Sequence, residues 1–261
     1  MADTYTHGHH ESVLRSHRWR TAQNSAAHLL PHLRPGLDVL DVGCGPGTIT
    51  ADLARLVAPG RVLGVDNAPE PVARARAEHP GAEFAVADVY ALPHPDDSFD
   101  VVHAHQVLQH LTDPVAALRE MRRVCRPGGV VAVRDADYGG MRWWPEHPGL
   151  DRWLELYRQV ARGNRAFPDA GRMLKPWARA AGFAEVRCSA STWCFADDEE
   201  RDWWGGLWAD RVRRSSLAEQ AVGRGLSDPA ELDRLAAAWR TWADDPDGWF
   251  AVPHGELRCH P

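Results

Sequence analysis

The sequence predicts an α/β fold built around a mostly parallel sheet. Residues 37–135 alternate short apolar runs of strand length with helix-like segments, the pattern of strand–helix–strand units with right-handed crossovers. The first strand passes into a helix through a turn with glycines at positions 43, 45 and 47. The regular alternation stops near residue 138, so we expect helical insertions in the second half.

The elements follow in order along the chain. Residues 11–33 look helical, with a break at Pro31, and precede the first strand. A helix at 170–181 is closed by Gly182, and a last strand at 249–259 contains Pro253, which predicts an edge position or a bulge there. The other expected strands are 39–42, 61–66, 84–89, 99–105, 130–135 and 185–195, and the other expected helices are 49–57, 150–162, 198–222 and 229–243.

The turn after the first strand indicates a nucleoside ligand. Glycines at such a turn let the backbone bend tightly and bring its N–H groups close to a ligand. Asp66 ends the second strand, about 20 residues past the turn, where a carboxylate can bind a ribose diol.

The glycine spacing distinguishes between nucleosides. Dinucleotide enzymes use G-x-G-x-x-G, whereas this chain has G-x-G-x-G, and Pro46 removes an amide that a phosphate would use. No phosphate-binding G-x-x-x-x-G-K-[ST] pattern occurs. An NAD(P)-dependent oxidoreductase remains an alternative, and a binding test with NADH would distinguish it.

Residues 34–133 resemble the class I S-adenosylmethionine-dependent methyltransferases, and within them the ubiquinone/menaquinone-biosynthesis (UbiE-like) type. The glycine motif and Asp66 are followed in the family's order by a third strand ending at Asp88, a turn-rich segment at 93–98 and a Pro-Gly-Gly turn at 127–129. The resemblance implies a Rossmann-like fold with a seven-stranded sheet whose last strand is antiparallel. It also implies S-adenosylmethionine as the cofactor.

The resemblance further implies which residues hold the cofactor. Asp41 should orient the backbone and the cofactor amine, Asp66 the ribose, and Asp88 with the next amide the adenine edge. His105 and Gln106 follow the fourth strand, where the family contacts the methionine portion. The full set of expected cofactor residues is Asp41, Gly43, Cys44, Gly45, Gly47, Asp66, Asn67, Asp88, Val89, His105 and Gln106.

Catalytic residues are harder to predict, because an activated methyl group needs positioning more than an obligatory side chain. Asp135 and Tyr138 lie where open α/β sheets place a substrate, and His105 is the third candidate, with a satisfied loop histidine as its alternative. Tyr157, Arg165 and His254 are weaker candidates.

The N-terminal segment, residues 1–35, is expected to form a helical lid. Tyr5 and the histidines at 9 and 10 could touch cofactor or acceptor, or belong to a solvated terminus. No carboxylate or cysteine stands at ligand spacing from the histidines at 7, 9 and 10, so no metal site is expected. Arg20 and Asn24, four residues apart, could meet the cofactor carboxylate or form a surface pair.

Tryptophan is the anomaly of composition, because eleven of the twelve lie after residue 140. They could line a pocket for an aromatic acceptor, form the core of a helical layer, or make a homodimer seam. Trp143 and Trp144, in a Pro/Gly-rich loop, are the expected pocket candidates.

Composition limits the remaining classes. The formal net charge of −6 argues against a nucleic-acid partner, and the basic run at 211–214 reads as a solvated helix face. Five scattered cysteines without a C-x-x-C pair, and no apolar stretch of membrane length, indicate a cytoplasmic protein without inserted segments.

We therefore expect one methyltransferase domain over 1–261, with a cofactor-binding half at 36–137 and a substrate-side half at 138–261. The expected activity is methyl transfer to carbon or oxygen of a small, aromatic or lipophilic metabolite. A catalytically inactive S-adenosylmethionine-binding partner protein is the second alternative.

Overall fold

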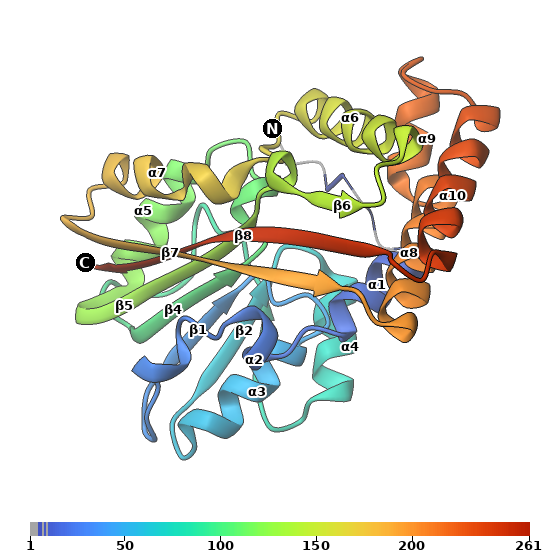
Figure 1. Ribbon diagram of the computed structural model, residues 1–261. Coiled ribbons are helices and arrows are strands. Elements are labelled where there is room, and N and C mark those ends of the chain that lie inside the picture. Colours follow the sequence, from blue (N-terminus) through green and yellow to red (C-terminus); the bar gives the residue numbers. More distant parts are fainter. Residues whose placement is uncertain (1–4, 7, 9) are drawn as a thin grey trace.

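One mixed sheet forms the centre of the molecule (Figure 1). A computed structural model describes residues 5, 6, 8 and 10–261, and within them the sheet has the order β3-β2-β1-β4-β5-β8-β6, with β7 paired to the other edge of β8. The first five strands are mutually parallel and β8 is antiparallel, which confirms the predicted α/β plan. The strands are β1 (Val39–Val42), β2 (Val62–Asp66), β3 (Glu83–Val86), β4 (Phe99–His105), β5 (Cys125–Ala136), β6 (Arg142–Trp144), β7 (Glu185–Phe195) and β8 (Trp249–His260).

The sheet has one strand more than the seven expected. β8 extends past the end of β5, because β5 pairs with it only as far as Ala136↔His254. The edge left open there is filled by β6, which pairs Trp143 with Phe250. The expectation that residues 142–144 form a loop was therefore wrong.

The sequence predicted an edge position or a bulge at Pro253, but β8 is not an edge strand. β8 lies between β5 and β7, and Pro253 is paired with Thr192 of β7. The carbonyl of Pro253 accepts a hydrogen bond from the amide of Asp137, at the point where β5 has ended and β6 has not begun. The proline nitrogen faces this same gap, so its missing N–H interrupts no ladder.

Helices cover both faces of the sheet, and the alternation of side chains along each strand supplies the two cores. Val39 packs beneath α2 and α3, whereas its neighbour Leu40 packs toward α5 and α7. The helix α4 packs against the β2–β3 edge. These elements are α2 (Ala22–Ser25), α3 (Thr48–Val57), α4 (Pro69–Glu78), α5 (Pro114–Val124) and α7 (Leu174–Ala180), with short 3-10 turns η1 (Leu30–His32), η2 (Leu108–His110), η3 (Tyr138–Gly140) and η4 (Ala170–Met173).

The N-terminal region is not one helix over 11–33. It divides into α1 (Glu11–Arg18), α2 and η1. Thr21 ends the first segment because its side chain accepts from the amide of Asn24, while the Asn24 side chain accepts from the amide of Thr21. This capping box starts a new helix, so Arg20 and Asn24 do not share a helix face.

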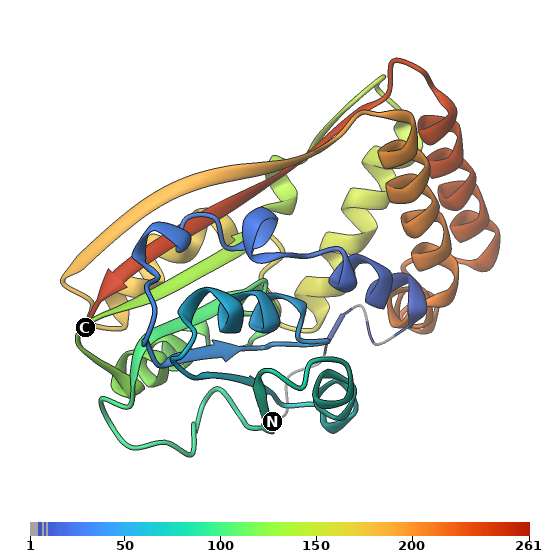
Figure 2. The same cartoon turned by 90° about the horizontal axis from the view of Figure 1, so that it is seen from below.

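A second layer of helices lies beyond the carboxyl ends of the parallel strands (Figures 1 and 2). It is carried there by β7 and β8, whose paired ends at 192–195 and 250–253 run past the end of β5. The expected helix at 198–222 is broken at Ser215, whose hydroxyl caps the following helix at the amide of Leu217. The layer consists of α6 (Pro148–Gly163), α8 (Asp198–Arg214), α9 (Ser216–Gly223) and α10 (Pro229–Asp244).

Most of the late tryptophans build the core of this layer. Trp153, Trp208 and Trp239 are almost fully buried, with the rings of Trp208 and Trp239 stacked at 5.8 Å. Trp143 stacks on Phe250, and Trp144 is 58% exposed. Neither residue lines the cavity described below, so their choice as pocket candidates was wrong.

Candidate active site

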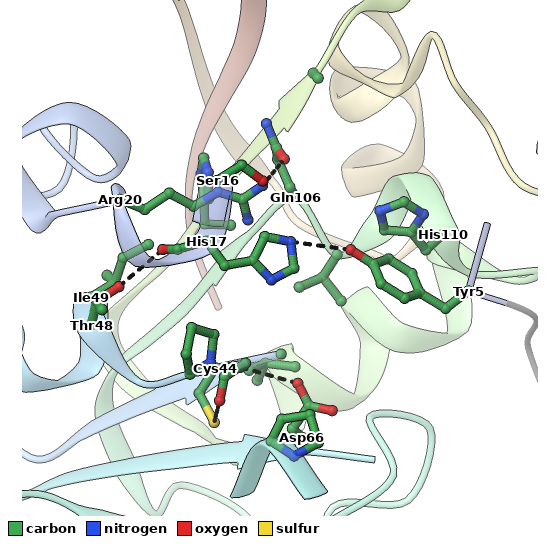
Figure 3. A pocket seen from close by; sticks show the side chains of 18 of the residues that line it. Tyr5, Ser16, His17, Arg20, Cys44, Thr48, Ile49, Asp66, Gln106 and His110 are labelled. Carbon is green, nitrogen blue, oxygen red and sulfur yellow. Dashed lines mark hydrogen bonds between the residues drawn. The ribbon is translucent and has the colours of Figure 1, made fainter. Parts of the chain in front are cut away.

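A cavity opens where the glycine turn meets the helical layer (Figure 3). Gly43, Gly45 and Gly47 all have left-handed backbone conformations, with φ of 69°, 52° and 83°. A Cβ at Gly43 would overlap Cγ2 of Val107, so glycine is required there for space as well as for conformation. Gly47 differs, because it does not line the cavity. A Cβ there would overlap the ring of Phe84, so glycine leaves room for that ring to pack against the turn.

Asp66 is fixed at the cavity wall by the turn itself. Its Oδ2 accepts from the amide of Gly45 at 3.1 Å and its Oδ1 from the amide of Ala68 at 3.0 Å. Both bonds hold the carboxylate at the carboxyl end of β2, where Figure 3 shows it next to Cys44. Asn67 lies beside it on the same wall.

Asp88 and Val89 form the next part of the wall, just beyond β3. Asp88 is exposed, and its Oδ1 accepts from the amide of Tyr90. Val89 is buried. Of the eleven residues predicted to meet the cofactor, all except Gly47 line this one cavity.

Asp41 is a buried residue of the cavity wall, and both oxygens of its carboxylate have partners within the protein. Its Oδ2 accepts from the hydroxyl of Thr50 at 2.6 Å, and its Oδ1 lies 2.7 Å from Nδ1 of His103. The carboxylate thus ties β1 to β4 and to α3 beneath the turn.

Gln106 links three elements at the cavity. Its Oε1 accepts from Arg20 at 2.6 Å, and its Nε2 lies 2.8 Å from Nε2 of His254. Nδ1 of His254 lies 2.9 Å from the carbonyl oxygen of Val252, so Nδ1 carries the proton and Nε2 accepts from Gln106. Burial, together with the charge of Arg134, holds the pKa of His254 well below 6.5. His254 therefore stands behind Gln106 and does not line the cavity.

His105 lies on the wall with unused hydrogen-bonding capacity. Its side chain is buried, and neither ring nitrogen has a hydrogen-bond partner within the described residues. Burial and the charge of Arg20 hold its pKa well below 6.5, so the imidazole is neutral. The ring of Trp193 lies 5.6 Å away.

Tyr138 also lines the cavity, whereas Asp135 does not. The ring of Tyr138 stacks on Tyr157 at 4.0 Å, and burial raises its pKa. Oδ1 of Asp135 accepts from the amide of Gln109 at 3.1 Å, and burial raises the pKa of Asp135 to about 7. Asp135 thus anchors η2 to β5, and its placement gives no contact with an acceptor in the cavity.

Four tryptophans and a methionine form an apolar part of the cavity. An aromatic pocket was one of the expected alternatives, but none of these five residues was named as its lining. We call these residues, Trp19, Trp193, Trp204, Trp208 and Met141, the aromatic chamber. Trp19 and Trp193 meet edge to face at 5.1 Å, and Trp204 and Trp208 do so at 6.0 Å. Trp19 is the single tryptophan ahead of residue 140, which had left it out of the pattern.

Two arginines also lie on the wall: Arg211 contradicts the expectation, whereas Arg20 agrees with one of its two expected placements. Arg211 is 4% exposed and faces the cavity, which contradicts the solvated face predicted for 211–214; only Arg213 and Arg214 of that run are exposed arginines. Arg20 points toward the cavity and not into a surface pair with Asn24. Arg165 is exposed and lies outside this cavity.

Tyr5 lies on the cavity wall next to α1. The hydroxyl of Tyr5 lies 3.2 Å from Nε2 of His17, and the Tyr5 ring meets His110 edge to face at 4.7 Å. Burial raises the pKa of Tyr5 to about 12. His10 caps α1 through the amide of Ser12, and the candidate His9 lies outside the described residues.

Over residues 5, 6, 8 and 10–261, no group of three or more His, Cys, Asp or Glu side chains could hold a metal ion. None of the helices in that part of the chain is long and apolar enough to cross a bilayer.

Comparison with known proteins identifies the family. A family model described as a methyltransferase domain matches residues 40–133. An uncharacterized methyltransferase of Schizosaccharomyces pombe is 36% identical over 97% of this chain and 95% of its own. The malonyl-[acyl-carrier protein] O-methyltransferase of Halorhodospira halophila is 35% identical over 80% of this chain and 68% of its own. The solved YcgJ protein of a Bacillus shares the fold, with a TM-score of 0.58 at 20% identity over 91% of this chain and 98% of that one.

The chain belongs to the class I S-adenosylmethionine-dependent methyltransferases, and S-adenosylmethionine is its cofactor. The residues present fit that molecule: a carboxylate at the end of β2 for a diol, a turn that admits no side chain at Gly43, and a buried apolar chamber beyond it. The dinucleotide alternative is not favoured.

Proposed function

We propose that this methyltransferase acts on oxygen or carbon of a small, aromatic or lipophilic metabolite. The supporting observation is the continuity of one cavity from the glycine turn into the aromatic chamber. Flat tryptophan faces favour an aromatic or apolar body, because such surfaces gain most from excluding water. The O-methyltransferase relative supports oxygen as the target, and the ubiquinone/menaquinone type rests on the motifs of residues 34–133.

The cofactor-binding half supports a division of roles. Asp66, held in place by two backbone amides, would accept from the ribose hydroxyls. Asp88 and the amide of Val89 would meet the adenine edge. Arg20, oriented by Gln106, would bind the methionine carboxylate.

The cofactor, when bound, supplies an activated methyl group, so the chain must mainly position the acceptor. Such positioning can supply about 7–11 kcal/mol of a barrier. His105 is the candidate to accept a hydrogen bond from an acceptor hydroxyl, since it is neutral and both ring nitrogens lack a partner within the described residues. Tyr138, on the same wall, would orient the acceptor ring.

The N-terminal segment would close the cavity and exclude water. Arg15 of α1 forms an ion pair with Asp210 of α8 at 2.6 Å, and the hydroxyl of Thr48 donates to the backbone oxygen of His17 at 3.3 Å. These bonds hold α1 between the helical layer and the glycine turn (Figure 2). A cytoplasmic location and a homodimer remain predictions.

The test combines binding with product identification. We expect S-adenosylmethionine and S-adenosylhomocysteine to bind in calorimetry. Methyl-labelled cofactor, incubated with protein and an extract of the native cell, should yield a labelled small molecule that mass spectrometry can identify. Cofactor binding without any labelled product would instead support a non-catalytic partner protein.

A further inference from the structure

We propose that the acceptor is an anion and that Arg211 binds its negative group. This inference rests on the proposed function and adds the substrate class. The observation behind it is a buried guanidinium on the wall of the aromatic chamber that has no counter-ion in the described part of the chain.

Arg211 is held rigidly but only partly satisfied. Its Nη2 donates to the backbone oxygen of Ser12 at 3.1 Å and to the hydroxyl of Ser16 at 2.9 Å, while its guanidinium lies 4.5 Å from the ring centre of Trp208. Its Nε is buried without a hydrogen-bond partner among the described residues. These neutral contacts orient the group without neutralising it.

The groups facing Arg211 from neighbouring elements supply no negative charge. They are Tyr138, Tyr5 and Tyr157, together with the cations Arg15 and Arg20. Burial raises the pKa of each of these tyrosines, so all three hydroxyls are neutral at pH 7. Arg15 is paired with Asp210.

The carboxylates on the cavity wall are engaged elsewhere. Asp41 accepts from Thr50 and His103, Asp66 from the amides of Gly45 and Ala68, and Asp88 from the amide of Tyr90. No carboxylate in the described residues lies within ion-pair distance of Arg211 or Arg20. Because a buried unpaired charge is costly, a ligand anion would relieve a cost that the chain itself leaves.

The two arginines differ in their partners, although both lie near the chamber: Arg20 is 5.8 Å from the ring centre of Trp193 and within electrostatic reach of Arg211. Arg20 is tied to Gln106, next to the glycine turn, which suits the cofactor. Arg211 stands on α8 beside Trp208, on the chamber side. The acceptor class that follows is an aromatic or apolar acid, with its ring against the tryptophans and its carboxylate or phenolate toward Arg211.

The experiment uses the full chain loaded with S-adenosylhomocysteine and matched probes that differ only in charge. The pairs are benzoate and benzamide, cinnamate and cinnamamide, and 2-naphthoate and 2-naphthamide, measured by calorimetry and tryptophan fluorescence. We expect at least one acid to bind tenfold or more tightly than its amide. If no acid binds more tightly than its amide, including the case in which none binds, the inference is wrong.

Variants assign the preference to Arg211. Arg211→Met should abolish it, and Arg211→Gln, which can still donate to Ser16, should do the same if the methionine variant fails to fold. Arg214→Met, exposed on the same helix, is the control and should keep the preference. An acid preference that survives both neutral substitutions would overturn the assignment. S-adenosylhomocysteine binding, measured first, separates this failure from failure of the proposed function.

Discussion

Nδ1 of His103 lies 2.7 Å from Oδ1 of Asp41, and both side chains are buried between β1 and β4. The hydroxyl of Thr50 bonds the other oxygen of the same carboxylate. The floor of the cofactor site is therefore a buried polar cluster that joins three elements, and we expect its loss to lower the stability of the fold.

Replacing Asp41 with alanine leaves two buried donors unsatisfied. Each such group costs about 1–3 kcal/mol, so Asp41→Ala should lower the free energy of unfolding by roughly 2–6 kcal/mol. Denaturant titration measures this, with Asp96→Ala as an exposed control. A loss no larger than the control's would show that the cluster does not support the fold.

Gly43 and Gly36 share a left-handed backbone but differ in surroundings, so they separate strain from overlap. A Cβ at Gly36 meets nothing within 4 Å, whereas one at Gly43 overlaps Val107. Gly36→Ala should cost about 1–2 kcal/mol of stability and leave cofactor affinity unchanged. Gly43→Ala should also weaken S-adenosylhomocysteine binding at least tenfold in calorimetry; equal effects of the two variants on affinity would contradict the role of the turn.

His105 should affect rate and not cofactor affinity. If its ring accepts a hydrogen bond from the acceptor, His105→Ala should lower kcat by roughly 10²–10⁴-fold while S-adenosylhomocysteine affinity stays within threefold. Single-turnover methyl transfer to the identified acceptor measures the first quantity and calorimetry the second. A wild-type rate in the variant would contradict this role of His105 and would mean that catalysis comes from positioning of the acceptor only.

Stability should fall as the pH drops from about 6.5 toward 4. Burial lowers the pKa of His28 and of His110 from 6.5 to about 3, and holds those of His105 and His254 well below 6.5, so these four side chains bind more protons in the unfolded chain than in the folded one in this range. Asp135 acts in the opposite direction, because its raised pKa of about 7 lets the folded state hold one proton that an ordinary carboxyl releases above 3.8.

The pKa values of His32 and His94 are lowered as well, so the histidines outnumber Asp135 and determine the sign. Denaturant titrations at several pH values measure the slope of the unfolding free energy against pH. A folded His110→Gln variant loses one of these titrating groups, so its slope should be smaller by about 1.4 kcal/mol per pH unit. A stability that rises on acidification would contradict the histidine assignments.

The cofactor half was predictable because its signals are local. The Gly43 turn, the carboxylate of Asp66 and the residues after β4 each follow a strand, and parallel strands bring their carboxyl ends to one edge. Gly47 shows the limit of the motif, since its position in the pattern could not reveal that it faces Phe84.

The chamber was not predictable in the same way. Trp143 has the loop-like neighbours of a pocket residue, yet the open edge of β8, set by pairing far along the chain, draws it into the sheet. Arg211 stands in a basic run whose pattern indicates solvent, and only the packing of α1 on α8 buries it. Tertiary contacts between distant segments decide both cases.

The most direct test of the cofactor assignment is the affinity of wild-type and Asp66→Ala protein for S-adenosylhomocysteine, with NADH as a competitor. We expect the wild type to bind S-adenosylhomocysteine and not NADH, and the variant to lose about 1.5–3 kcal/mol for each charge-assisted bond to the ribose. Binding of NADH in its place, or equal affinity in the two proteins, would contradict the site described above.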